Sequence, residues 1–190
     1  MNRVFLLSPA NCNGVRAGWL LRQNSRSALA QRLRSESGAP IGEVFTFLSA
    51  LYFRGKLTYA LTFAQPPEHS IGAAIITPTI GLLSSDTPIG ITHLRGFSRV
   101  PISVKNQRYR NSLCRAAQDF ADQIGPACEV VLLGSIATSK YLELLLPIFG
   151  ERLRVPAQFI GLGDMSRGGL LLRCVREQRE LDYIAVSEII

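Results

Sequence analysis

Three short and almost uninterrupted apolar runs stand out along the chain, at Arg3–Ser8, Ile71–Thr77 and Cys128–Leu133. Apolar runs of this length between turn residues are typical of central strands that are covered on both faces. Pro9 and Pro78 directly follow the first two runs and end them. We therefore expect the three runs to form neighbouring, largely parallel strands of one sheet.

Apolar residues at spacings of three and four positions predict helices between these strands. The predicted helices run from Val15 to a break at Ser35–Pro40, over Ile41–Ala64 with a bend near Gly55, over Lys105–Ile124 and over Ala137–Ile148. The other segments are further strands over Val155–Ile160 and Leu181–Val186, a polar-rimmed loop over Thr79–Leu83 and an irregular stretch over Gly90–Val104. Because strand and helix alternate, the sequence predicts an α/β protein, a single three-layer αβα domain over residues 1–190 with a mostly parallel central sheet.

The composition fits a globular chain, since 47% of the 190 residues are hydrophobic and only 18% are charged. The longest apolar stretch, Val130–Gly150, is interrupted by Lys140, Glu143 and Pro147 and predicts no membrane span. The early apolar run Val4–Leu7 is too short for the core of a signal peptide. We expect a cytoplasmic protein.

The cysteines and histidines predict neither a metal site nor a disulfide framework. The four cysteines are Cys12, Cys114, Cys128 and Cys174, and no two of them form a C-x-x-C pair. With only two histidines in the chain, the spacing matches no zinc pattern. We expect four free thiols and no metal, and the sequence does not indicate a cofactor.

The net charge of +7 is unevenly distributed. Residues 1–120 hold 14 basic and 5 acidic residues, a charge of +9, whereas residues 121–190 hold 7 and 9, a charge of −2. Of the 21 basic residues 18 are arginines, a bias that a GC-rich genome also produces. The functional interpretation is an anionic partner, nucleic acid or phosphate, bound by the first part of the chain.

A first candidate site lies where the third predicted strand passes into a helix, at Gly134-Ser135-Ile136-Ala137-Thr138-Ser139-Lys140. Free backbone N–H groups at the helix start, the hydroxyls of Ser135 and Thr138 and the ammonium of Lys140 suit an anion or a carbonyl-rich base. The spacing is not that of a P-loop. The alternative is an ordinary strand–helix turn in which a hydroxyl caps the helix and Lys140 faces solvent.

A second candidate site is the glycine-rich segment Gly161–Gly169, predicted as a loop. Its glycines allow a close approach to a ligand, and Arg167 can clamp a phosphate or carboxylate. Asp164 can act as a general base or can orient Arg167, and Ser166 adds a hydroxyl. The alternative is a salt bridge between Asp164 and Arg167 that only closes a wide turn.

Polar residues also follow the first two strands. Ser8 and Asn11 come after the first and Thr77 ends the second. If the strands are parallel, these residues open on the same edge of the sheet, where α/β proteins bind ligands. We therefore expect them to contact the ligand, although proline and asparagine also form such turns for structural reasons alone.

Three segments carry a resemblance to a known family: Ser8-Pro9-Ala10 after the first predicted strand, Ile76–Leu83 after the second, and the late strand–helix turn that reaches Tyr141. Together they resemble the YaaA-like group of bacterial α/β proteins. The resemblance implies a single α/β domain with a basic cleft and a link to nucleic acid or to the stress response.

Two functions fit these features. In the first, the protein binds a nucleotide, a nucleoside or a nucleic-acid end in a cleft, and as an enzyme it would use Asp164 and Ser135 as catalytic residues on a phosphate- or base-containing substrate. In the second, it is a non-enzymatic interaction protein whose arginine-rich surface binds RNA or an acidic protein. One pocket that holds the candidate residues would favour the first function. One patch formed by the arginines of Arg16–Arg34 and Arg95–Arg115 would favour the second.

Overall fold

The computed structural model describes residues 1–189, and a six-stranded sheet lies at its centre. In spatial order its strands are β4 (Gly81–Ser84), β3 (Ala73–Thr77), β1 (Arg3–Leu7), β6 (Glu129–Leu133), β7 (Leu153–Pro156) and β8 (Tyr183–Ala185). A separate two-stranded ribbon joins β2 (Ala39–Pro40) and β5 (Pro88–Ile89).

The three predicted central strands are neighbours in this sheet, which confirms that prediction. β1 pairs in parallel with both β3 and β6, and β7 extends the parallel part of the sheet. The outer strands β4 and β8 run antiparallel to their neighbours. The prediction of a mostly parallel sheet is therefore wrong, because the sheet is mixed and has an antiparallel strand at each edge.

A tight turn produces the antiparallel edge at β4. The buried hydroxyl of Thr77 accepts the N–H of Ile80 at 3.1 Å and donates to the carbonyl of Gly81 at 3.0 Å. A connection this short joins only antiparallel strands. Part of Thr79–Leu83, predicted as a loop, is therefore strand, because pairing with β3 determines its structure more than its own weak pattern does.

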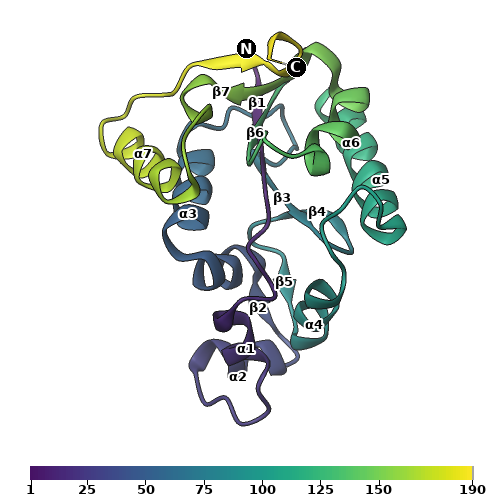
Figure 1. The fold of residues 1–190 in the computed structure, drawn as a ribbon, viewed down its shortest axis with the longest axis vertical. Coiled ribbons are helices and arrows are strands. Elements are labelled where there is room, and N and C mark those ends of the chain that lie inside the picture. Colours follow the sequence, from purple (N-terminus) through teal and green to yellow (C-terminus); the bar gives the residue numbers. More distant parts are fainter. Residues whose placement is uncertain (190) are drawn as a thin grey trace.

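Helices cover the sheet on both sides. They are α1 (Val15–Leu21), α2 (Ala28–Arg34), α3 (Ile41–Phe63), α4 (Ile91–Arg99), α5 (Gln107–Ile124), α6 (Ser139–Phe149) and α7 (Asp164–Arg176). In Figure 1, α3 and α7 lie beside one face of the sheet and α5 and α6 beside the other, while α1, α2 and α4 gather near the β2–β5 ribbon. Strand residues alternate between two apolar clusters, with Leu7 and Ile75 in one and Leu6 and Ile76 in the other. Among the residues described, no helix has the length and apolar character needed to cross a membrane.

Three predicted segments differ from the structure. The helix expected from Val15 is two helices, since the hydroxyl of Ser27 accepts the N–H of Ala30 and starts α2 anew. The stretch expected to be irregular contains α4, whose short length leaves only Leu94 and Phe97 buried and so gives little periodicity. The strand expected over residues 155–160 is shifted toward the N-terminus and ends at Pro156.

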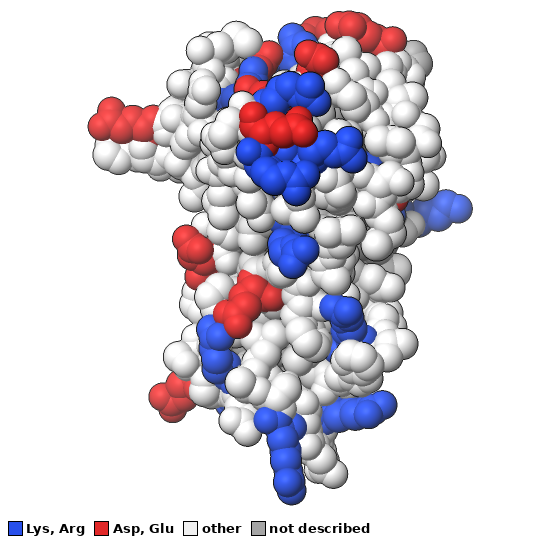
Figure 2. Space-filling model, turned by 90° about the vertical axis from the view of Figure 1, so that its left-hand side faces the viewer, with Lys and Arg blue, Asp and Glu red and all other residues white. Residues whose placement is uncertain are grey.

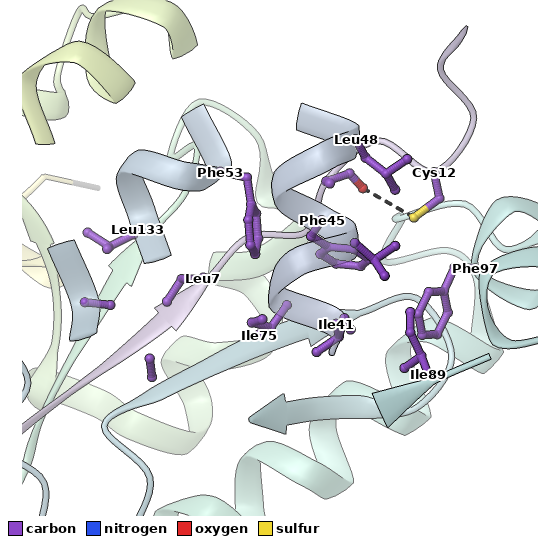
Figure 3. Packing of buried hydrophobic residues seen from close by; sticks show 14 of the residues in the cluster. Leu7, Cys12, Ile41, Phe45, Leu48, Phe53, Ile75, Ile89, Phe97 and Leu133 are labelled. Atoms are coloured by element: carbon purple, nitrogen blue, oxygen red, sulfur yellow. Dashed lines mark hydrogen bonds between the residues drawn. The ribbon is translucent and has the colours of Figure 1, made fainter. Parts of the chain in front are cut away.

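The bend in α3 lies at Ala50 rather than at Gly55. Ala50 has φ 43° and ψ −118°, outside the helical region, so α3 consists of two helical parts. Phe45 and Phe53, on either side of the bend, pack edge to face with ring centroids 5.4 Å apart (Figure 3). The bend allows both parts of α3 to cover the sheet.

The predicted glycine loop is mostly helix, since α7 begins at Asp164. One of its glycines, Gly168, is needed for helix packing together with Gly55 of α3. A Cβ atom at Gly168 would lie 2.9 Å from the Cα of Tyr52, and one at Gly55 would lie 2.8 Å from the carbonyl oxygen of Gly168. These two glycines let α7 and the second part of α3 touch through their backbones.

Candidate active site

A cavity of about 380 Å³ opens at the carboxyl ends of β1 and β6. Its lining includes five residues predicted from the sequence: Ser8, Asn11, Ser135, Lys140 and Asp164. The first two follow β1, the next two belong to the turn after β6 and the first turn of α6, and the last begins α7. This is the edge of the sheet where α/β proteins bind their ligands.

The other predicted site residues do not line this cavity. Thr77 is used in the β3–β4 turn, and Thr138 lies at the exposed start of α6 beside a separate apolar hollow. Ser166 is exposed on α7. Gly134 packs against Ser8, whose Cβ would lie 3.0 Å from a Cβ atom at Gly134. Arg167 is buried.

Arg167 is a helix residue and not a loop residue. Its guanidinium donates to the carbonyl of Phe159 at 3.0 Å and lies 3.5 Å from the carboxylate of Asp164. It also stacks over the ring of Phe159 at 5.2 Å. These contacts match the alternative of a salt bridge between Asp164 and Arg167, and they use the guanidinium that the sequence predicts as a clamp for phosphate or carboxylate.

Lys56, on α3, is the central residue that the sequence analysis missed. It is 1% exposed, and its Nζ lies 2.6 Å from the carbonyl oxygen and 2.7 Å from the Oγ of Ser8. The same Nζ lies over the rings of Tyr52 at 4.3 Å and Phe53 at 5.1 Å. Ser8 therefore separates a fully buried amine from the cavity.

Burial lowers the pKa of Lys56 to about 7. Removing the ammonium from water is the largest cause, and the positive charges of Arg167 and Lys140 lower the pKa further, against the opposing effect of Asp164. Among the described residues, no carboxylate forms an ion pair with Lys56. Near neutral pH a large fraction of Lys56 is therefore an uncharged amine.

Tyr52 is a second missed residue of the site. Its side chain lines the cavity, and its buried hydroxyl has no hydrogen-bond partner within residues 1–189. Burial is the largest effect on its pKa and raises it, against the opposing effect of the neighbouring Arg167 guanidinium, so the phenol stays protonated. A buried hydroxyl without a partner is unfavourable in the free protein and is available to a ligand.

A smaller hollow of about 280 Å³ adjoins the main cavity. The two share Ala10, Asn11 and Ile102 in their linings, and the smaller one continues to Pro78 and Phe97. The main cavity is thus polar, and its extension is largely apolar. Together they fit the size range of small-molecule sites.

Cys12 also borders the extension but is not a reactive thiol. Its Sγ donates to the carbonyl of Ala10 at 3.6 Å (Figure 3), and burial raises its pKa to about 12. The four cysteines are free in the structure. Within the described part of the chain, no group of three or more His, Cys, Asp or Glu residues is arranged to hold a metal ion.

Three of the five arginines in the segment Arg16–Arg34 contact other groups of the protein from exposed positions. Arg16 donates to the carbonyl of Phe47, Arg32 pairs with Glu43 at 2.7 Å, and Arg34 donates to three backbone carbonyls. Figure 2 shows the face that holds α3 and α7, where a cluster of basic groups with acidic groups among them lies in the upper part and single basic groups lie below it. The basic groups of this face therefore do not form one patch along its length.

The comparisons with known proteins give no match: no family model, curated protein or solved structure matches this chain. The resemblance to the YaaA-like group therefore stays a prediction. Because a fold alone does not define a function, the function has to be inferred from the chemistry of the cavity.

Proposed function

We propose that the protein binds a small phosphate-bearing molecule of nucleotide size in the cavity at the carboxyl ends of β1 and β6, and that it acts on this molecule as an enzyme. The observation that carries the proposal is the convergence of polar groups from separate segments, Ser8, Ser135 and Lys140, on one cavity. The unpartnered hydroxyl of Tyr52 supports a ligand there. Polar groups converging in one concave site are typical of ligand binding.

The charged part of the ligand belongs beside Lys140. This residue lies in the first turn of α6, where the free N–H groups and the helix dipole also favour an anion. Within the described chain, no acidic side chain pairs with Lys140. The apolar extension toward Pro78 and Phe97 suits a base or another flat apolar group.

We infer in addition that the chain is a three-layer αβα domain of the kind the YaaA-like resemblance implies. The helices on both sides of the sheet and the two separate apolar clusters support this architecture. The alternative function, an arginine-rich surface for RNA or an acidic protein, is less well supported, because Arg16, Arg32 and Arg34 already contact other groups of the protein at its surface.

Thermal unfolding with nucleotides and nucleosides tests the proposal. A ligand at 100 times its dissociation constant stabilises a protein by about 2.7 kcal/mol, which raises Tm by roughly 5 to 10 °C for a chain of this size. We expect a phosphate-bearing nucleotide to raise Tm and its nucleoside to have a smaller effect. Lys140→Ala should remove most of the shift.

The matched control is Lys105→Ala, which removes the same charge from an exposed position outside the cavity. We expect it to keep the wild-type response. An equal loss in both variants would mean that the ligand responds only to net charge and would contradict the cavity as the site. A shift with RNA oligonucleotides alone would support the surface-binding alternative.

A further inference from the structure

We propose that Ser8 and Lys56 form a nucleophile–base pair that hydrolyses a carboxylic ester, with Ser8 Oγ as the nucleophile and Lys56 Nζ as the general base. The choice of ester rests on the proposed function: the ester carries the phosphate group that Lys140 attracts. The pair replaces Asp164 and Ser135, the residues that the sequence indicated for catalysis.

The geometry of the two side chains carries the proposal. Ser8 lines the cavity. Lys56, on α3, contacts Ser8 from the protein interior, with its Nζ 2.7 Å from Ser8 Oγ. An uncharged amine has two N–H donors and one lone pair. In the structure Nζ donates to the Ser8 carbonyl at 2.6 Å and to Ser8 Oγ at 2.7 Å. In the uncharged form, the lone pair of Nζ can instead accept the hydroxyl proton across the second contact. This is the arrangement in which a base activates a hydroxyl.

The surroundings of Lys56 favour the uncharged form. Asp164 and Arg167 face it from α7, Lys140 from α6, and Tyr52 from its own helix. Burial is the dominant effect, and it lowers the pKa of the amine to about 7, the range in which a general base works best at neutral pH. Asp164 is exposed and has Arg167 as its nearest cation.

A purely structural role of Lys56 explains only one of the two contacts that its Nζ makes with Ser8. The Ser8 carbonyl needs a donor at the end of β1, and Lys56 supplies it. The second contact, to Ser8 Oγ, satisfies no backbone group, and the hydroxyl belongs to a residue of the cavity wall. A carbonyl alone does not require a fully buried amine, because backbone N–H groups or water usually satisfy such groups at no cost in charge.

The reaction then proceeds in two balanced steps. Ser8 Oγ attacks the ester carbonyl carbon while Lys56 Nζ takes the hydroxyl proton; the bond to the alcohol oxygen breaks, and Lys56 returns the proton to that oxygen. A water molecule next attacks the acyl-Ser8 carbon and gives its proton to Lys56. Collapse of the second intermediate releases the acid, and Ser8 Oγ takes the proton back. The net change is ester plus water to acid plus alcohol.

Candidate donors for the negative oxygen of the intermediates belong to residues that line the same cavity as Ser8. Within residues 1–189, no hydrogen bond engages the backbone N–H groups of Asn11 and Ser135, two residues that line the same cavity. The hydroxyl of Tyr52 is also free. Donors that are fixed before the reaction stabilise a developing oxyanion strongly.

An alkyl fluorophosphonate tests the nucleophile, because it phosphonylates an activated serine with loss of fluoride. We expect the full-length protein to gain one adduct, located on Ser8 by peptide mass spectrometry. Ser8→Ala should abolish the adduct, and Lys56→Met should slow labelling by about 10²-fold or more. Ser37→Ala, at an exposed position outside the cavity, is the matched control and should label at the wild-type rate.

The pH dependence of labelling in the wild-type protein provides a second test that needs no variant. We expect the rate to rise with a midpoint near pH 7 and then to level off, as Lys56 loses its proton. A rate that rises steadily up to pH 10, an adduct elsewhere than Ser8, or wild-type labelling of a folded Lys56→Met protein would overturn the proposal.

Nucleotide binding measured on the same samples separates this inference from the proposed function. Labelling of Ser8 without nucleotide binding would support the nucleophile and contradict the phosphate-bearing ligand. Binding that depends on Lys140 without any labelling of Ser8 would overturn the nucleophile and leave the binding cavity intact.

Discussion

The charged residues at the amino ends of the parallel strands are paired with opposite charges, and those at the carboxyl ends are less fully paired. At the amino end, Glu129 lies 2.9 Å from Arg3 and 2.8 Å from Arg154, and Arg3 also pairs with Glu180 at 2.5 Å. Each of these charges has an opposite charge in contact. The network joins β1, β6 and β7 to the segment before β8.

At the carboxyl end the charged and polar groups are left less satisfied. Lys56 is buried with no carboxylate bound to it, and the Tyr52 hydroxyl has no partner among the described residues. Proteins depart from full satisfaction of polar groups mainly at sites that bind or react. We infer that the paired charges at the amino end stabilise the sheet, whereas the unpaired polar groups at the carboxyl end lower the stability of the protein and serve binding or catalysis.

Breaking the network at the amino end should have the largest effect on stability. Glu129→Ala leaves Arg3 with one partner and Arg154 with none of its present ion pairs, so we expect the free energy of unfolding to fall by about 3 kcal/mol. Urea denaturation measures it. Ser8 labelling in the folded protein should be unchanged. The control Glu36→Ala removes an exposed carboxylate, for which a change within about 0.5 kcal/mol is expected.

The same contrast explains how much of the fold the sequence could predict. Residues such as Leu6 and Leu7 are buried on opposite faces, so a central strand is a continuous apolar run and is recognisable without its neighbours. β4 and β8 are edge strands with partly exposed residues, and their direction depends on the turns that precede them. Their pairing cannot be derived from local pattern.

The site was predictable to the extent that it follows strand ends. Ser8, Ser135 and Lys140 were found because each lies just after a strand or at the start of the next helix. Lys56 lies in the middle of an apolar helix, and the bend at Ala50 and the packing of α7 determine where its amine goes. Its signal was weak but present: it is one of only three lysines and stands between Gly55 and Leu57 in a largely apolar stretch.

Lys56→Met tests the comparison through the pH dependence of the free energy of unfolding. The folded-state pKa of Lys56 is lowered from 10.5 to about 7, so between these values the unfolded chain binds a proton that the folded protein does not. The stability of the wild type therefore rises with pH through that window. From pH 7 to pH 9 this one group should add about 2 to 3 kcal/mol, and the variant should lack that rise.

Subtracting the two unfolding curves at each pH removes the contributions of all other titrating groups. The difference should be constant below pH 7, where Lys56 carries its proton in both states. If the stability of the wild type and of Lys56→Met changed in parallel from pH 6 to pH 9, Lys56 would keep its charge in the folded protein. The proposed difference between the amino and carboxyl ends of the strands would then be wrong.

Arg167→Met tests whether the carboxyl end contains structural contacts as well as reactive ones. The sequence alone predicts that Arg167 clamps the anionic ligand, in which case its loss would abolish binding and leave stability nearly unchanged. Because Arg167 is buried and donates to the Phe159 carbonyl, we now expect a loss of about 2 kcal/mol. Ligand binding in the folded fraction should weaken only modestly. Thermal unfolding and calorimetric titration of the same preparation measure the two effects, and wild-type stability with abolished binding would restore the original prediction.

The smallest expected effect, and the sharpest control, concerns two neighbouring glycines on α7. Gly168→Ala places a methyl group 2.9 Å from the Tyr52 Cα and 3.0 Å from the Leu51 carbonyl oxygen, whereas Gly169→Ala meets nothing within 4 Å. Both substitutions gain about 0.5 to 1 kcal/mol of helix propensity. Overpacking against backbone should outweigh that gain at Gly168, for a net loss of about 1 to 2 kcal/mol, while Gly169→Ala should be stabilising.

The Gly168 contact also positions the second part of α3, which carries both Tyr52 and Lys56. A shift there should slow Ser8 labelling in Gly168→Ala and leave Gly169→Ala at the wild-type rate. Equal stability of the two variants in urea would mean that α7 moves away from α3 without cost. The position of the amine beside Ser8 would then not depend on the backbone contact between the two helices, and the carboxyl end would be held by Arg167 and the apolar cluster instead.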